Sequence, residues 1–396
     1  MKDLKHMIYF ENMLQSADNE LVKQAVSEGK HALGYTCYFI PEVLLNLQGC
    51  FSVRLRAPNT GETDVGTYYM SSKTCPFSRS ILERGIEGGY NFLSAMISSE
   101  TCQMMHRAHE HFEMLDLVKN NPDFYLTMID VPFEVTDYYL EQYEEQLQKL
   151  VLEPLNRVYG IDISDEAILR AIVDHNEICS IITELGELRK LNNPPITSYE
   201  FHVLQLVSEC CPQYLIKDKL YETLKEVRKR KTDPEPSYRA RVVVTGSEVD
   251  DPEFTKLLES CGIYVVADRY CYGSIPGREK IEIKKGETPL KAIARHYLET
   301  SKCPRFMSHS KSGERREQLA QLVDDYNADG IIYLQMKFCE FWSYERVLGC
   351  EIMNNELNIP TMGIEKEYNL ASAGQLRTRF QAFVESLEIK KIQGGD

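Results

Sequence analysis

The sequence predicts an α/β protein in which two parallel-sheet domains flank a helical region. In both outer parts of the chain, short apolar segments typical of strands are separated by amphipathic segments typical of helices. Between about residues 136 and 230, apolar residues recur three and four positions apart, which indicates helices almost throughout. The expected domains are an N-terminal α/β domain at 1–135, a helical connecting region at 136–235 and a C-terminal α/β domain at 236–396.

The first two regions contain the following expected elements. Strands are predicted at 53–55, 95–98 and 125–129, and helices at 77–85, at 104–115 and from Pro41 and Glu42 onward. Helical periodicity then covers 137–160 and 164–191, and Ser164 is the expected N-cap of the second segment. The segment 228–240 is charged and contains two prolines, so it is expected to be a linker.

The third region alternates strand and helix patterns. Strands are expected at 241–246, 263–268, 328–338 and 359–365, and helices at 251–260, 340–357 and 371–388. Because helices of this length separate the strands, the sheet should be parallel and covered on both faces.

Composition excludes several functions. The 60 Asp and Glu residues outnumber the 45 Lys and Arg residues, and the resulting charge of −15 does not favour binding to a phosphate backbone. No apolar run approaches the ~18 residues of a membrane span, and the N-terminus lacks a secretory signal pattern, so we expect a soluble cytoplasmic protein. Neither a GxGxxG motif after a strand nor a GxxxxGK[ST] motif is present, so the chain is not expected to hydrolyse a nucleotide itself.

Three of the twelve cysteines stand out by position. Cys75 precedes Pro76, a residue favoured at the first helical position, while Cys102 and Cys339 each follow a predicted strand and open a predicted helix. We therefore expect all three at strand-to-helix junctions, on the sheet edge where ligands bind. The positive end of a helix should lower a thiol's pKa and stabilise a thiolate-ligated iron–sulfur cluster. Three thiolates would leave one iron of a cubane without a protein ligand.

Other cysteines and histidines offer alternatives. Cys102, His106 and His109 are spaced to share one helix face and could bind zinc, although interleaved arginine and glutamate favour a solvated face. Five cysteines within predicted helices are expected to be buried core residues: Cys179, Cys210, Cys211, Cys261 and Cys350. Three more lie outside them: Cys37 in an expected capping loop, Cys271 on a possible pocket rim and Cys303 in a loop.

Several segments carry a resemblance to a known family, among them the stretches around Cys75 and Cys102. Residues 329–383 resemble the C-terminal signature of the 2-hydroxyacyl-CoA dehydratase and benzoyl-CoA reductase family, and residues 34–58 are similar to its N-terminal motif. The resemblance implies two Rossmann-like domains and an iron–sulfur cluster bound by Cys75, Cys102 and Cys339. That cluster would be a [4Fe-4S] cubane or, as in some homodimeric relatives, part of an [8Fe-9S] double cubane.

The resemblance also implies an activity, a lyase reaction. A separate ATPase activator with its own [4Fe-4S] cluster would deliver one electron, and a ketyl radical of the 2-hydroxyacyl-CoA would then lose water in an oxygen-sensitive, anaerobic reaction. The chain looks more like the smaller, partner-type subunit, because the motif that carries a serine in catalytic subunits here holds Thr36, Cys37 and Tyr38. Thr36, Tyr38 and Glu42 are the candidate catalytic residues.

Several alternatives stay open at this point. A reductase of the double-cubane or benzoyl-CoA reductase type would use the same three cysteines for low-potential electron transfer. A subunit that binds no cluster and serves only in assembly is a third possibility. The acyl group of the substrate, the general base, and the choice between a homologous partner subunit and a second copy of the chain are likewise open.

Overall fold

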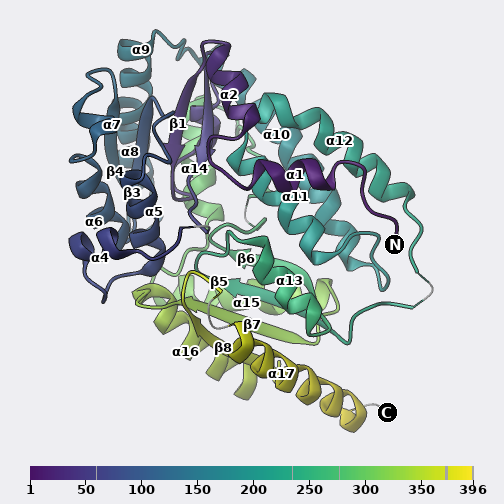
Figure 1. Cartoon of the computed structure of the whole chain (residues 1–396). Coiled ribbons are helices and arrows are strands. Elements are labelled where there is room, and N and C mark those ends of the chain that lie inside the picture. Colours follow the sequence, from purple (N-terminus) through teal and green to yellow (C-terminus); the bar gives the residue numbers. More distant parts are fainter. Residues whose placement is uncertain (59, 234, 276, 371–372, 395–396) are drawn as a thin grey trace.

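The described residues form two four-stranded sheets in which all neighbouring strands are parallel (Figure 1). The structure, a computed structural model, describes residues 1–58, 60–233, 235–275, 277–370 and 373–394. The first sheet has the order β2-β1-β3-β4, with β1 (His31–Tyr35), β2 (Cys50–Arg54), β3 (Ala95–Glu100) and β4 (Tyr125–Asp130). The second has the order β6-β5-β7-β8, with β5 (Ala240–Gly246), β6 (Ile263–Tyr270), β7 (Gly330–Met336) and β8 (Thr361–Lys366). The predicted α/β fold class is confirmed.

Helices surround both sheets and form a layer beside them (Figure 1). Those before the second sheet are α1 (Met7–Met13), α2 (Glu20–Ser27), α3 (Glu42–Leu45), α4 (Asp64–Met70), α5 (Pro76–Ile86), α6 (Gln103–Phe112), α7 (Asp116–Lys119), α8 (Asp137–Gln146), α9 (Glu153–Tyr159), α10 (Asp165–Glu187), α11 (Ser198–Cys210) and α12 (Gln213–Lys229). A π-helical segment (Leu147–Leu152) joins α8 to α9, and a 3₁₀ turn (Leu188–Lys190) follows α10. The others are α13 (Pro252–Ser260), α14 (Pro289–Thr300), α15 (His309–Asp325), α16 (Glu340–Asn355) and α17 (Ala373–Gly394).

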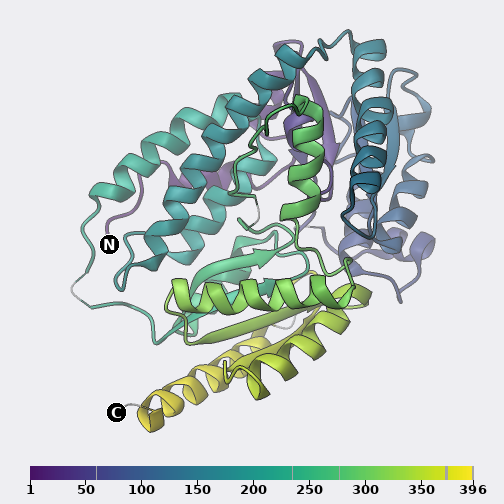
Figure 2. The same cartoon turned by 180° about the vertical axis from the view of Figure 1, so that it is seen from behind.

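Each face of the first sheet belongs to a different hydrophobic core. Alternate side chains of a strand point to opposite faces, so Ala32 of β1 packs with residues of α5, α6 and α11, whereas Leu33 packs with residues of α8, α9 and α10. Helix α14 also joins this second core and packs against α8 and α10, although it comes from the C-terminal third of the chain (Figure 2). The domain boundaries at 135 and 235 stay a prediction.

The second sheet is buried on both faces in the same way. Val242 and Val244 of β5 pack with α13 and α17, while Val243 between them packs with residues of α15 and α16. Continuous apolar runs such as 242–244 are typical of a parallel sheet covered on both faces.

Most predicted elements are present, with ends displaced by a few residues. Ser164 is confirmed as the N-cap of α10, since its hydroxyl accepts a hydrogen bond from the Ala167 N–H at 3.3 Å. The prediction missed β1 and did not assign α14 or α15. The first two residues of the predicted helix 371–388 lie outside the described residues.

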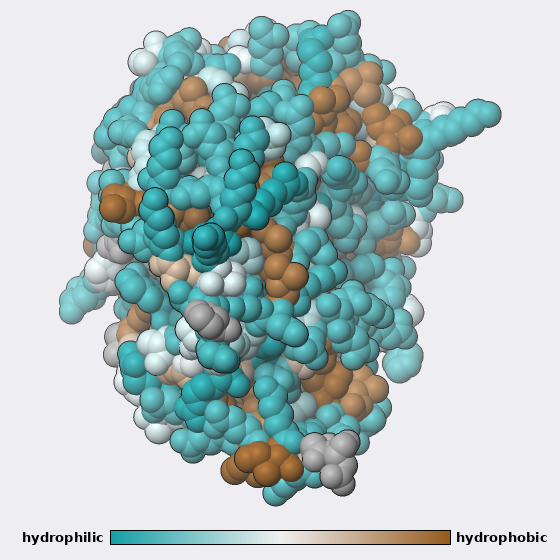
Figure 3. Space-filling view, turned by 90° about the vertical axis from the view of Figure 1, so that its right-hand side faces the viewer, coloured by the Kyte–Doolittle hydropathy of each residue, from teal (hydrophilic) through white to brown (hydrophobic). Residues whose placement is uncertain are grey.

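Within the part of the chain that the structure describes, no helix is long and apolar enough to cross a membrane. Figure 3 shows one face of the molecule, on which hydrophilic side chains predominate and hydrophobic ones gather in small, separate groups.

Gly246 is the position where the second sheet tolerates least change. A Cβ at this residue would lie 2.3 Å from the carbonyl oxygen of Leu334 in the neighbouring strand β7, and backbone atoms cannot move aside cheaply. We expect Gly246→Ala to lower the free energy of unfolding by about 1–3 kcal/mol, as overpacking does, measured by urea titration. Gly313→Ala in α15 is the control, because the Cβ of the new alanine would meet no atom within 4 Å. This substitution should raise the free energy of unfolding by up to ~1 kcal/mol. Equal losses in the two variants would contradict this explanation.

Candidate functional site

The three singled-out cysteines occupy the same kind of position in the fold. Cys75, Cys102 and Cys339 are the N-cap residues of α5, α6 and α16, as predicted. Cys102 and Cys339 lie just past the ends of β3 and β7, but Cys75 follows α4 and a short turn. The prediction that all three sit at strand-to-helix junctions is therefore wrong for Cys75. Pro76 alone indicates a helix start at this position, and that signal does not depend on a preceding strand.

The fold brings these three side chains to one cavity. Cys75, Cys102 and Cys339, from segments far apart in the sequence, line a chamber of about 80 Å³. An adjoining chamber of about 100 Å³ shares part of its wall, and Cys102 and Trp342 face both. We call the two chambers together the thiol cavity.

Three further cysteines line the thiol cavity: Cys37, Cys271 and Cys303. Cys37 lies in the loop before α3, as expected, and it also lines the cavity, where it accepts a hydrogen bond from the Thr101 hydroxyl at 3.5 Å. Cys271, expected on a pocket rim, does line the cavity. Within the described residues all cysteines are free thiols, so the cavity carries six possible soft ligands.

The thiol pKa values differ from the prediction. Burial raises the pKa of Cys102 to about 12 and that of Cys75 and Cys339 well above the usual value. The hydrogen bond from the Met105 N–H to the Cys102 sulfur, at 3.5 Å, acts in the opposite direction and is outweighed. The helix N-terminus therefore does not make these thiols acidic by itself. A bound metal cation would, because coordination removes the thiol proton.

The donor set suits a cluster better than a single ion. Among the residues that the structure describes, no three His, Cys, Asp or Glu side chains are grouped closely enough to hold one metal ion, the three thiols included. An iron–sulfur cubane needs a wider arrangement, because each thiolate binds a different iron. Cys75, Cys102 and Cys339 are the residues that could hold it.

The zinc alternative finds no support in the histidines. His106 contacts Glu100 and, at 3.5 Å, Glu110 on an exposed surface, as expected for a solvated helix face. His109 is buried, and its Nδ1 lies 2.9 Å from the Ser98 hydroxyl, so the predicted solvated face is wrong for this residue. The 3.6-residue periodicity of α6 turns His109 inward together with Met105 and Phe112.

A partly buried glutamate in the thiol cavity was missed by sequence reasoning. Glu248 lies two residues beyond the end of β5 and lines both chambers. Its Oε2 atom is buried and has no hydrogen-bond partner, and burial raises its pKa. In the sequence, the acids after Gly246 indicate only that a bound pyrophosphate is disfavoured. Their place at the carboxyl edge of a buried strand was the available signal.

Thr36 and Tyr38 line the larger chamber of the thiol cavity. Thr36 is buried, and the Tyr38 hydroxyl lies 2.9 Å from the hydroxyl of Thr300. Burial raises the pKa of Tyr38 well above its usual value, so the phenol stays protonated and can donate a hydrogen bond.

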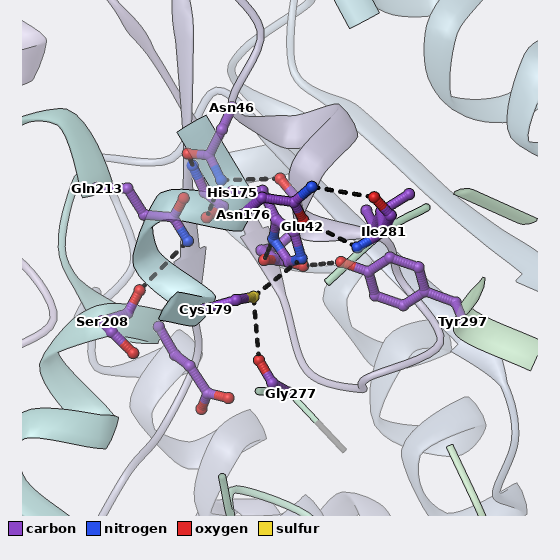
Figure 4. A network of polar contacts seen from close by, with 12 residues as sticks. Glu42, Asn46, His175, Asn176, Cys179, Ser208, Gln213, Gly277, Ile281 and Tyr297 are labelled. Carbon is purple, nitrogen blue, oxygen red and sulfur yellow. Dashed lines mark hydrogen bonds and ion pairs between the residues drawn. The ribbon is translucent and has the colours of Figure 1, made fainter. Parts of the chain in front are cut away.

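Glu42, the third candidate catalytic residue, lines a separate polar chamber next to the thiol cavity. It belongs to the network of polar contacts drawn in Figure 4. Its Oε1 is 2.7 Å from His175 Nδ1, and its Oε2 accepts a hydrogen bond from the Tyr297 hydroxyl. Burial raises the pKa of Glu42, but His175 and Tyr297 outweigh this and lower it to about 2. Tyr38 and Arg54 line this polar chamber and also the larger chamber of the thiol cavity, so they form the wall between the two.

The same network corrects the prediction for Cys179. Its sulfur is 3.3 Å from His175 Nε2 and also 3.3 Å from the carbonyl oxygen of Gly277 (Figure 4). Cys179 is thus a buried polar partner rather than a plain core residue. Cys210, Cys211 and Cys261 are buried as expected, and Cys350 is partly buried.

Positive charge faces the larger chamber. Arg54 pairs with Glu209 at 2.9 Å, whereas the buried guanidinium of Arg269 has two nitrogen atoms, Nε and Nη1, without a hydrogen-bond partner. Lys302 also lines this chamber. Such groups favour a ligand that carries partly or fully negative oxygen atoms.

Together, the two parallel sheets and their buried thiols define an α/β protein with a candidate thiolate site where distant helix N-termini meet. The chain belongs to the family described as "2-hydroxyglutaryl-CoA dehydratase, D-component", whose family model matches residues 37–387.

Named relatives cover nearly the whole chain. The beta subunit of (R)-phenyllactyl-CoA dehydratase from Clostridium sporogenes is 23% identical over 378 residues, 96% of this chain and 97% of the relative. The beta subunit of lactoyl-CoA dehydratase from Anaerotignum propionicum is 24% identical over 366 residues, 91% of this chain and 92% of the relative. A benzoyl-CoA reductase subunit from Thauera aromatica is 21% identical over 372 residues, again 91% and 92%.

Proposed function

We propose that this chain is the iron–sulfur subunit of a 2-hydroxyacyl-CoA dehydratase that receives electrons from an ATP-dependent activator. The observation that carries the proposal is the meeting of Cys75, Cys102 and Cys339, three helix N-cap thiols, in one cavity of a chain that belongs to this family. When bound, a [4Fe-4S] cluster would supply low-potential one-electron chemistry.

The chain's own residues would bind and shield the substrate. Arg269 and Lys302 present positive charge to the larger chamber, which suits the oxygen atoms of a thioester and its 2-hydroxyl group. The protonated Tyr38 hydroxyl can donate a hydrogen bond in the same chamber. The apolar walls formed by Phe77, Met105 and Trp342 would keep water away from the thiols.

A reductase is the second candidate function, favoured by the match to a benzoyl-CoA reductase subunit. Such a protein, of the benzoyl-CoA reductase or double-cubane type, would use the same three cysteines with reduction as the net reaction. In a protein of the double-cubane type, an [8Fe-9S] double cubane would replace the single cubane.

The partner is proposed from the relatives, which are named as subunits of dehydratases and of a reductase. We propose that the chain assembles with a homologous second subunit or with a second copy of itself.

Dehydration of a thioester panel tests the proposed reaction. The chain, purified anaerobically with its co-purifying partner, should release water from at least one 2-hydroxyacyl-CoA when activator and ATP are supplied, and exposure to air should abolish the activity. Product formation is followed by liquid chromatography of the acyl-CoA esters. Reduction of an enoyl-CoA or aromatic acyl-CoA without water loss would favour the reductase. Less than one iron per chain would eliminate both functions.

A further inference from the structure

The open coordination position of the proposed cluster has a candidate occupant within this chain. Resting on the proposed function, we infer that the Glu248 carboxylate binds the iron that Cys75, Cys102 and Cys339 leave without a thiolate. Glu248 lines both chambers of the thiol cavity, so its side chain faces the same space as the three sulfurs.

The backbone around Glu248 is held by the second sheet. The N–H of Ser247 donates to the carbonyl oxygen of Leu334 at 3.1 Å, and the Ser247 hydroxyl accepts from the N–H of Met336 at 2.5 Å. The N–H of Cys339 in turn donates to the carbonyl oxygen of Met336 at 2.9 Å. Glu248 and Cys339 are therefore fixed to each other through one pair of strands, which gives the carboxylate a defined position relative to a ligand.

One oxygen of the Glu248 carboxylate lacks a hydrogen-bond partner. Glu248 Oε2 is buried without a hydrogen bond, and although Lys366 and Arg54 act to lower the pKa of Glu248, no ion pair joins either of them to it among the described residues. No hydrogen bond joins it to a described thiol either. Buried carboxylate oxygens are normally paired or bound to a metal, so an oxygen without a hydrogen bond in a cavity of thiols is available to bind a cation.

Glu248 lines the same chamber as all three proposed ligands. Once deprotonated, these four side chains would together carry four negative charges in one cavity, which is stable only around a cationic core.

A carboxylate differs from a thiolate as an iron ligand. Its oxygen is a harder donor and binds more weakly to a cluster, so the fourth position would be protected yet exchangeable. Water is the competing occupant.

The test compares anaerobically reconstituted wild-type protein with Glu248→Gln and with Glu253→Gln. Glu253 is the matched control, because it follows Glu248 by five residues but is exposed and lies outside the thiol cavity. Ferricyanide takes one electron from [4Fe-4S]²⁺, which releases Fe²⁺ and leaves [3Fe-4S]⁺, and the electron paramagnetic resonance signal of the product gives the rate. We expect Glu248→Gln to react about tenfold faster or more, as loss of a ligand contact does, and Glu253→Gln to match the wild type.

A second measurement needs no variant. If water occupies the position, the spectrum of the reduced wild-type cluster should broaden in ¹⁷O-enriched water. With Glu248 bound we expect no broadening. Broadening in the wild type, or equal oxidation rates in all three proteins, would overturn the assignment while leaving the cluster itself intact. A wild-type protein that binds less than one iron would overturn the proposed function as well.

Discussion

Each of the single variants Cys75→Ala, Cys102→Ala and Cys339→Ala should contain about a tenth of the wild-type iron or less. A cubane that is bound by three thiolates cannot keep its position with two. Iron and acid-labile sulfide are measured after anaerobic reconstitution, together with the absorbance of the cluster near its charge-transfer band. The effect should be equally large for all three residues, since each is the N-cap of a different helix and none can replace another.

Two other cysteines serve as controls. Cys261 and Cys350 lie outside the thiol cavity, and their replacement with alanine should cost about 1 kcal/mol of folding free energy without loss of iron. Cys179 is not a suitable control, because its contact with His175 makes it part of the polar network. Equal iron loss from all five variants would refute the assignment of ligands.

The cysteine positions could be predicted because their signals are local. Pro76 marks the first turn of α5, and the strand-to-helix change in periodicity marks Cys102 and Cys339, so each helix start follows from about ten residues of sequence. The same local patterns predicted most strands of both sheets. Strand β1 was missed because its five residues, with Gly34 among them, offer neither a long apolar run nor a clear alternation.

The rest of the site depends on contacts that no local pattern carries. Cys37 and Cys303 reach the thiol cavity from loops more than two hundred residues apart, and α14 crosses back to the first sheet to place Tyr297 against Glu42. Glu248 differs from the acidic residues next to it in the sequence only because its side chain faces the thiol cavity. Such placements follow from how the two sheets and the helices between them are arranged in space, and a sequence without that geometry gives only the residue types.

The Glu42–His175 pair gives the second large effect. Glu42→Gln should lower the free energy of unfolding by about 2–3 kcal/mol at pH 6, somewhat less than the loss of a permanently charged buried pair, because His175 can release its proton. His175 is 7% exposed and Glu42 16%, so water replaces the lost partner only in part. Urea titration measures the change. The control is Glu166→Gln on α10, the helix that carries His175. It removes an exposed partner of Arg170 and should change the free energy of unfolding by less than about 0.5 kcal/mol.

The pH dependence provides an independent sign test of this pair. The pKa of Glu42 is lowered to about 2, so its contribution is complete above pH 4.5 and is lost as the pH falls toward 2. Burial lowers the pKa of His175, but Cys179 and Glu42 outweigh this and raise it well above 6.5. The contribution of His175 to stability is therefore complete below pH 6.5 and declines as the pH rises through the pKa of His175 in the folded protein. Wild-type stability should therefore decline on the alkaline side of pH 6.5, and Glu42→Gln should flatten that decline. A variant whose alkaline slope equals that of the wild type would show that Glu42 does not hold the proton on His175.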